Sequence, residues 1–356
     1  MDTAITTKVY PEVRQELAEV FEHARQYMKP DCRVCRVCNG VNCRVIPTER
    51  SGTAERNYTQ LQKVRILYDT IYEGGDGSEI DSSTELFGHR FRAPLMSAPF
   101  GHVHDFNPNT HFAGDYEFNK ALLDGTADAG ICGWTPDTLG DDVFTGPLDA
   151  LKEHHGIGIP AIKSWAIQDI QEKIRMCDEA GVMAIGHDID CVGLPYLSVN
   201  GRGKTYPKSV EQIRETFSVT KTPFILKGIM SARGALKALE AGASGIVVSN
   251  HSGNTLDQGL ATVEVLPEIK KAVGDRMKIF ADGGVRHGED VFKMLALGAD
   301  VVMIGRPYII AAEGGEARGV ALYSQKIVWE LQNAMRMSGC RTLADITPEH
   351  VIPTKD

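Results

Sequence analysis

Residues 277–307 read MKIFADGGVRHGEDVFKMLALGADVVMIGRP, and this stretch decides the fold. It holds two short apolar runs, the first ending in paired glycines and the second in Gly-Arg, with a helical pattern between them. Continuous apolar runs are typical of parallel strands that helices cover on both faces. The stretch therefore predicts a strand, a helix and a second parallel strand, which together make one βαβ unit.

The same pattern repeats along most of the chain. Apolar runs begin near residues 94, 128, 159, 182, 223, 244, 277 and 299, and each leaves room for a following helix. Eight such units close into a (β/α)8 TIM barrel. The alternative, a doubly wound sheet, needs a G-x-G-x-x-G turn after its first strand, and none is visible.

The predicted organisation is an α/β barrel over residues 91–356, preceded by an extension over residues 1–90. The extension begins with a helix over residues 10–29, where apolar side chains recur at helical spacing. A Cys-rich turn and an irregular lead-in follow. The longest gap between runs, after the run that starts at 182, predicts a lid over the C-terminal face of the barrel.

The composition excludes several classes of protein. With 42% hydrophobic and 24% charged residues, the chain is neither disordered nor a small disulfide-bonded scaffold. Its 38 basic residues are dispersed and outnumbered by 47 acidic ones, which argues against nucleic acid. The sequence also lacks a long apolar segment and a secretory signal. We expect a cytoplasmic homo-oligomer that acts on a small molecule, with neither a membrane nor a nucleic-acid partner.

Polar residues gather at the ends of the eight runs, where barrel enzymes carry their reactive groups. The strand-end residues are Ser97, Cys132, Lys163, His187, Asp188, Asp190, Lys227, Ser249, Asn250, His251, Asp282 and Arg306. The last two ends read ADGGVRHG and IGRP. Glycines let backbone N–H groups approach an anion, and Arg286 and Arg306 can each fork onto phosphate oxygens. These two ends predict a phosphate-bearing ligand.

Several stretches carry a resemblance to a known family: ILKGI (225–229), SNHSGNTLD (249–257), IFADGGVRHGEDVFKMLALGAD (279–300) and IGRP (304–307). They resemble the FMN-dependent α-hydroxy-acid oxidase and dehydrogenase family, which includes glycolate and lactate oxidases. Weaker matches extend the similarity over roughly residues 56–310. The resemblance implies FMN as cofactor and the oxidation of an α-hydroxy acid, or a related alcohol, by hydride transfer to the flavin.

The resemblance also implies roles for individual residues. His251 matches the catalytic base, Asp188 the carboxylate that orients it, and Lys227 the lysine that faces the flavin ring. A histidine can accept a proton at neutral pH, and a neighbouring carboxylate stabilises the resulting imidazolium. The implied cofactor-binding residues are Pro99, Phe100, Gly101, Lys163, Lys227, Ser249, Asp282, Gly283, Gly284, Arg286, Gly305 and Arg306.

The sequence departs from the family where the substrate carboxylate is held. The family's arginine, three residues after the histidine, is Asn254 here. The neutral amide of asparagine cannot form the two parallel, charge-assisted hydrogen bonds that a guanidinium makes to a carboxylate. Trp165 stands where the family has a tyrosine, and Arg202 is a loose match to a second arginine. With Asn254, these two are the predicted substrate-contacting residues. Either another cation replaces the lost arginine, or the substrate differs. A reductase or isomerase acting on a non-carboxylate substrate, and a non-catalytic flavin electron carrier, are the alternatives.

Cys32, Cys35, Cys38 and Cys43 have the spacing C-x2-C-x2-C-x4-C. Three cysteines at this interval followed by a fourth are closer to iron–sulfur ligation than to two separated zinc pairs. The spacing predicts a metal site, either an iron–sulfur cluster or zinc. The alternative is a reduced structural turn.

Overall fold

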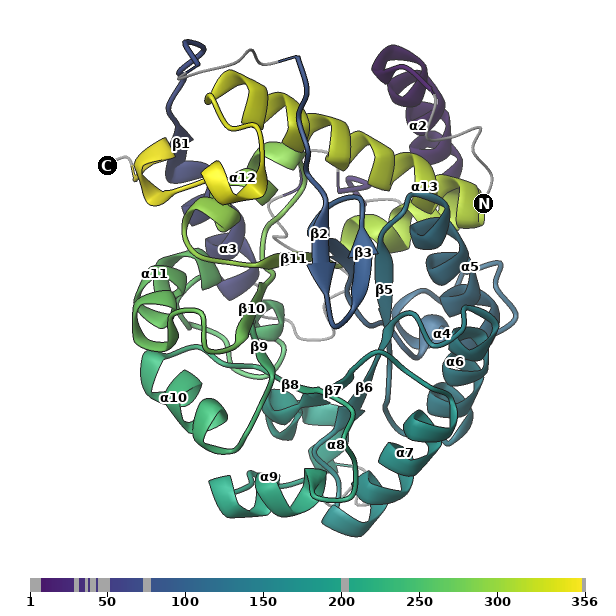
Figure 1. The fold of residues 1–356 in the computed structure, drawn as a ribbon. Helices are drawn as coiled ribbons and strands as arrows, with labels where there is room; N and C mark the ends of the chain where they lie inside the picture. The colour runs from purple at the N-terminus through teal and green to yellow at the C-terminus, as the bar shows by residue number, and fades with distance from the viewer. Residues whose placement is uncertain are drawn as a thin grey trace.

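The computed structural model describes residues 8–28, 32–35, 38, 43, 52–72, 78–199 and 205–353. Its centre is a closed barrel of eight parallel strands, in the order β10-β11-β4-β5-β6-β7-β8-β9 (Figure 1). The strands are β4 (Leu95–Ser97), β5 (Cys132–Thr135), β6 (Ile159–Lys163), β7 (Ile185–Asp188), β8 (Phe224–Lys227), β9 (Gly245–Val248), β10 (Lys278–Ala281) and β11 (Val301–Ile304). Each falls within one of the eight apolar runs, so the predicted TIM barrel is confirmed.

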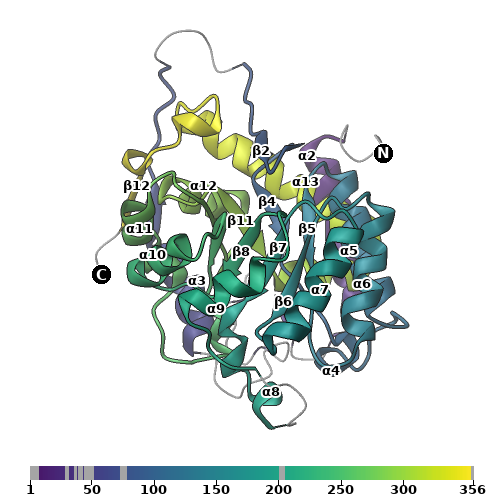
Figure 2. The ribbon, with the colours of Figure 1, turned by 60° about the horizontal axis from the view of Figure 1, so that its bottom comes forward.

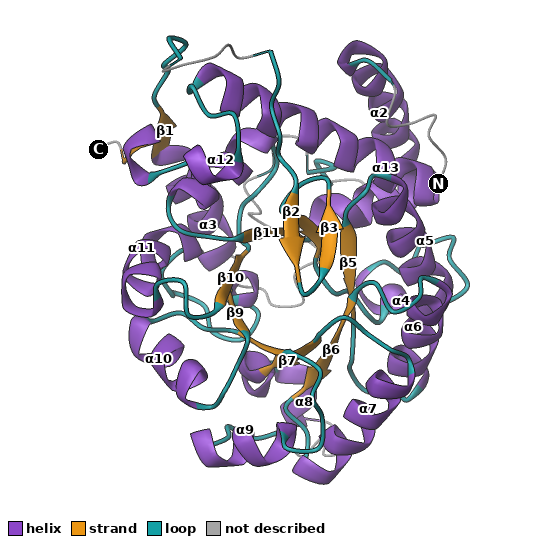
Figure 3. Ribbon diagram, in the orientation of Figure 1, coloured by secondary structure: helices purple, strands orange, loops and turns teal. Residues whose placement is uncertain are grey.

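Helices surround the barrel, as the secondary-structure colouring of Figure 3 shows. They are α4 (Val103–Phe106), α5 (Asp115–Asp128), α6 (Asp142–Glu153), α7 (Ile167–Glu179), α8 (Pro195–Val199), α9 (Val210–Phe217), α10 (Ala232–Glu240), α11 (Thr262–Val273), α12 (Gly288–Ala296) and α13 (Arg306–Met337). Two short ones, α4 and α8, lie at the C-terminal end of the barrel (Figure 2). Because helices cover the outside and side chains fill the inside, the strands are almost wholly buried. Among the described helices, none combines the length and apolarity that crossing a bilayer requires.

The N-terminal extension packs onto the barrel at several points (Figure 2). Helix α2 (Tyr10–Ala24) lies along α13 and buries Val13, Leu17 and Phe21. Helix α3 (Gly52–Lys63) contacts α11 and α12. Strand β1 (Val64–Ile66) pairs antiparallel with β12 (Val351–Pro353), so the lead-in is joined to the C-terminal segment.

A hairpin closes the end of the barrel at which the strands begin. It consists of β2 (Thr84–Leu86) and β3 (His89–Phe91), joined through Phe87 and Gly88. Leu86 and Phe91 are buried in the same apolar cluster as the residues that fill the barrel interior. The opposite end, where the strands finish, is left for polar side chains.

Candidate active site

A cavity of about 440 Å³ lies at the C-terminal ends of the strands. This volume is within the usual range for ligand and cofactor pockets. Most of the predicted site residues line it: Pro99, Phe100, Gly101, Lys163, Asp188, Lys227, His251, Asn254, Asp282, Gly283, Gly284, Arg286, Gly305 and Arg306. Residues far apart in the sequence therefore meet in one cavity, as was expected from their positions at the ends of the predicted strands.

Two arginines form one end of the cavity. Arg286 follows the glycine turn after β10, and Arg306 is the first residue of α13; both are buried. The Nε and Nη2 atoms of Arg286 and the Nη1 atom of Arg306 are buried without a hydrogen-bond partner among the described residues. Buried guanidinium N–H groups normally have acceptors, and the oxygens of a phosphate would supply them.

The backbone between these arginines is shaped for close approach. Gly283 has φ +104°, a conformation that side chains rarely adopt, and a Cβ atom there would lie 2.6 Å from Thr262 Oγ1. Gly305 precedes the N-terminus of α13, where backbone N–H groups and the helix dipole favour an anion. The cavity end therefore fits the phosphate of FMN.

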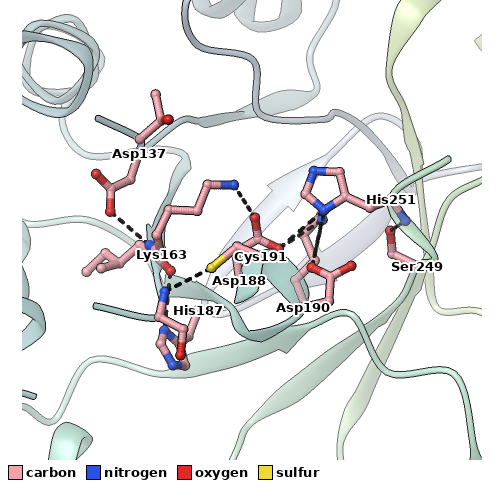
Figure 4. A network of polar contacts seen from close by, with 12 residues as sticks. Asp137, Lys163, His187, Asp188, Asp190, Cys191, Ser249 and His251 are labelled. Carbon is pink, nitrogen blue, oxygen red and sulfur yellow. Dashed lines mark hydrogen bonds and ion pairs between the residues drawn. The ribbon is translucent and has the colours of Figure 1, made fainter. Parts of the chain in front are cut away.

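The opposite side of the cavity holds a network of buried charges (Figure 4). The ammonium groups of Lys163, at the end of β6, and Lys227, at the end of β8, both donate to Asp188 at the end of β7. The Lys227 Nζ to Asp188 Oδ1 distance is 3.1 Å, and Lys163 bonds the other carboxylate oxygen. All three side chains are buried, so the two cations share one carboxylate, and Asp190 Oδ1 lies 4.0 Å from Lys227 Nζ as a second acidic neighbour.

These contacts determine the protonation states in the network. Burial alone would raise the pKa of Asp188, but the charges of Lys163, Lys227 and His251 outweigh it and hold that pKa well below its ordinary value. Burial would likewise lower the pKa of Lys227, yet Asp188 and neighbouring carboxylates raise it. Lys227 is therefore a fixed cation at neutral pH. By contrast, burial raises the pKa of Asp282.

His251 begins the short 3-10 turn His251–Gly253 that follows β9, with φ +52°. Its Nδ1 atom lies 3.3 Å from Lys227 Nζ, 3.2 Å from Asp190 Oδ1 and 3.8 Å from Asp188 Oδ1. Figure 4 shows the ring directed toward both carboxylates. Asp190 appeared among the polar strand ends but was not assigned a role, although it is the carboxylate nearest to His251.

Three predicted residues do not line the cavity or cannot be placed in it. Trp165 donates its indole N–H to Asp137 at 2.6 Å and is absent from the cavity wall, so the structure does not support its predicted substrate contact. Ser249 bonds Asp282 at 2.8 Å and lies behind the lining. Arg202 lies outside the described residues.

Cys35 and Cys43 of the Cys-rich segment lie near the arginines of the phosphate end. Cys43 is hydrogen-bonded to Arg306, and Cys35 is buried near Arg286 and Arg306. Burial raises the pKa of the Cys35 thiol to about 12. The four sulfurs, all within the described residues, do not place three ligand atoms within 4.8 Å of one another. The geometry thus gives the predicted metal site no support.

Comparison with known proteins identifies the family. Residues 198–353 match the family model "FMN-dependent dehydrogenase". The chain is 32% identical over 336 residues to glycolate oxidase 5 of Oryza sativa subsp. japonica, covering 83% of this chain and 85% of that protein. It belongs to the FMN-dependent α-hydroxy-acid oxidase and dehydrogenase family. As a family member it is an FMN-dependent oxidoreductase, which the cavity's phosphate end independently supports.

Other members and solved structures agree with this assignment. The peroxisomal (S)-2-hydroxyacid oxidase of Arabidopsis thaliana is 47% identical over 340 residues, covering 85% of this chain and 90% of that protein. A mandelate oxidase variant solved with a monooxide FMN adduct superposes with a TM-score of 0.74 at 25% identity, covering 95% of this chain and all of that chain. The family and its barrel are therefore established for this sequence.

Proposed function

We propose that the protein oxidises an α-hydroxy acid, or a related alcohol, with His251 as the base. The observation that carries the proposal is the position of His251: it lines the cavity beside Lys227 and two carboxylates, across from the phosphate end. When bound, FMN supplies the acceptor for the hydride that leaves the substrate carbon. The phosphate would be held by Arg286, Arg306 and the glycine turn.

The residues of the chain then have defined tasks. His251 takes the proton from the substrate hydroxyl while the carbon–hydrogen bond breaks, so an alcohol becomes a carbonyl group. Lys227, a fixed cation, stabilises negative charge that develops in the cavity. Asp188 keeps both lysines charged and in place.

The substrate carboxylate, if there is one, has an unusual environment. Asn254 lines the cavity where the family carries an arginine, and the lysines near His251 are Lys163 and Lys227. Relatives named for glycolate, lactate and mandelate support a hydroxy acid. The neutral Asn254 favours the second candidate, a neutral alcohol or a compound reduced or isomerised at the flavin.

Anaerobic flavin reduction tests the function directly. The FMN-loaded protein is mixed with a panel of α-hydroxy acids and alcohols, and bleaching of the flavin absorbance is followed. We expect reduction by at least one hydroxy acid and a loss of about two to four orders of magnitude in rate in His251→Ala, with FMN retained. His104→Ala, an exposed histidine, is the control. An unchanged rate in His251→Ala would contradict the role of His251 as base, and a lack of flavin reduction by every compound in the panel would favour an electron carrier.

Four further expectations rest on the sequence. We propose a cytoplasmic location, a homo-oligomeric state and the division at residue 90, although two relatives are named as peroxisomal. An iron–sulfur cluster or zinc at the four cysteines stays a prediction of their spacing. Metal analysis with visible spectroscopy of anaerobically purified protein tests it, since less than stoichiometric iron and zinc would return the segment to a structural role.

A further inference from the structure

The carboxylate nearest to His251 is Asp190, which lies just beyond the strand. Asp190 lies on the 3-10 turn Ile189–Gly193, and its Oδ1 atom is 3.2 Å from His251 Nδ1. Asp188, the carboxylate that the family pattern assigns to this task, is at 3.8 Å. Two acidic residues therefore compete for one imidazole nitrogen.

Asp188 is already committed to other partners. Each of its oxygens accepts a hydrogen bond from a buried lysine, one from Lys163 and one from Lys227. Lys163 is therefore a second buried cation on the same carboxylate. Both oxygens of Asp188 are thus engaged by ammonium groups, and its Oδ1 atom lies 3.8 Å from His251 Nδ1, which is beyond hydrogen-bond distance.

The surrounding backbone makes room for Asp190. Gly228 follows Lys227 with φ +104°, and a Cβ atom there would lie 2.5 Å from the Asp190 Cβ atom. Gly193 ends the turn, and a Cβ atom at that position would lie 2.6 Å from the Thr255 carbonyl oxygen. The turn that carries Asp190 is thus packed directly against the segment after His251, which fixes their distance.

The choice of partner decides which imidazole nitrogen can act as base. Lys227 Nζ is 3.3 Å from Nδ1, and a lysine donating there would leave the proton on Nε2. A carboxylate at Nδ1 instead accepts the Nδ1–H bond and leaves the Nε2 lone pair free. The other charged groups facing His251 are Asp188 and Asp282, and Asp190 Oδ1 itself lies 4.0 Å from Lys227 Nζ.

We propose that Asp190 is the positioning residue that holds His251 in the Nδ1–H tautomer and stabilises its protonated form. Asp190 itself is absent from the cavity lining, so it acts through His251. This inference rests on the proposed role of His251 as base. Asp188 then serves to hold Lys163 and Lys227 in place as cations.

Nitrogen-15 NMR of the FMN-loaded protein without substrate gives the first test. We expect the Nδ1–H tautomer for neutral His251 in the wild type and a shift toward Nε2–H in Asp190→Asn. Asp190→Glu, which restores the charge, should recover the wild-type tautomer at least in part. An Nε2–H tautomer in the wild type, or no change in Asp190→Asn, would overturn the inference.

Flavin reduction supplies the second test, using whichever panel substrate reduces the wild type fastest. We expect Asp190→Asn to slow reduction at saturating substrate by roughly 10²-fold or more, to leave KM nearly unchanged and to move the acidic limb of the pH profile to lower pH. In the His251→Ala background, Asp190→Asn should cost nothing further. An equal cost in both backgrounds would make Asp190 merely structural.

The outcomes separate this inference from the proposed function. If His251→Ala leaves flavin reduction unchanged, the proposed function fails. If His251→Ala abolishes reduction but Asp190→Asn is as fast as the wild type, only the inference fails. FMN content, read from the visible spectrum, checks that each variant is folded.

Discussion

Gly284 lies directly against the backbone of Asn57: a Cβ atom at the glycine would be 2.6 Å from the Asn57 carbonyl oxygen. This contact joins the phosphate turn after β10 to helix α3 of the extension. The phosphate end of the cavity is therefore supported from outside the barrel.

Gly284→Ala should release FMN for this reason. The substitution forces α3 and the turn apart, which displaces the neighbouring Arg286. Gly88→Ala is a matched control, because Gly88 has φ +81° against +82° for Gly284 but open space around its Cβ position. Both variants should lose about 1 kcal/mol of stability from backbone strain. Thermal unfolding and FMN content are measured, and equal FMN content in the two variants would disprove the argument.

Arg286→Ala combined with Arg306→Ala should remove most of the FMN. Each charged hydrogen bond to phosphate contributes roughly 1.5–3 kcal/mol, so the dissociation constant of FMN should rise at least a hundredfold. Arg318→Ala, whose side chain is 65% exposed on α13, is the control. Titration of each apoprotein with FMN, followed by flavin fluorescence, gives the dissociation constant of FMN for the wild type, the double variant and the control. Full occupancy in the double variant would refute the phosphate assignment.

Asn254→Arg tests the substrate class. Among the described residues, the Asn254 Oδ1 atom is buried without a hydrogen-bond partner, at a position that lines the cavity. An arginine there supplies the cationic fork that a carboxylate prefers, so activity on lactate or glycolate should appear or rise. Asn254→Gln, which adds length without charge, should give no such gain. Strong wild-type activity on these acids, unimproved by the arginine, would show that another cation already holds the carboxylate.

Glu330→Gln should make the protein less stable, with a defined dependence on pH. Burial would raise the pKa of Glu330, but its contacts with His287, Lys326 and the Gly288 N–H outweigh it and lower the pKa to about 2. Because the folded-state value is the lower one, the stabilisation is present above the ordinary value near 4.5 and is lost as the pH falls toward 2.

We expect the wild type to exceed Glu330→Gln by about 3 kcal/mol in free energy of unfolding at pH 6, a difference that vanishes near pH 2. Urea unfolding at a series of pH values measures it. The exposed Glu85→Gln is the control, with a difference near zero throughout. A difference for Glu330→Gln that did not change with pH would show that charge is not its cause.

Much of the fold and the site could be predicted from the sequence because the barrel strands are short, continuous apolar runs. Strands β1, β2 and β3 lack that signal, since each has three residues of mixed exposure and is defined by its partner strand. The lead-in was therefore interpreted as irregular. The helix over 10–29 was predicted too long by a turn, since α2 ends at Ala24.

At the site, single residues were predicted less well than the strand ends that carry them. The contact of Asp190 with His251, 61 residues later, depends on a 3-10 turn that the sequence pattern does not reveal. The available signal in the sequence was Gly228, the glycine after Lys227, which leaves room for Asp190. Trp165 matched a substrate position in the family pattern, yet a buried hydrogen bond to Asp137 accounts for its indole. Side-chain partners of this kind follow from tertiary packing, which a motif does not contain.

Because the hairpin of β2 and β3 closes one end of the barrel, the cavity opens at the other end alone in the described part of the chain. Leu86 and Phe91 fill the end of the barrel at which the strands begin, so small molecules reach the reactive groups from the C-terminal end. Substrate, product and the final electron acceptor then share one entrance to the cavity. Such a layout favours ping-pong kinetics, in which the oxidised product departs before the acceptor collects the electrons.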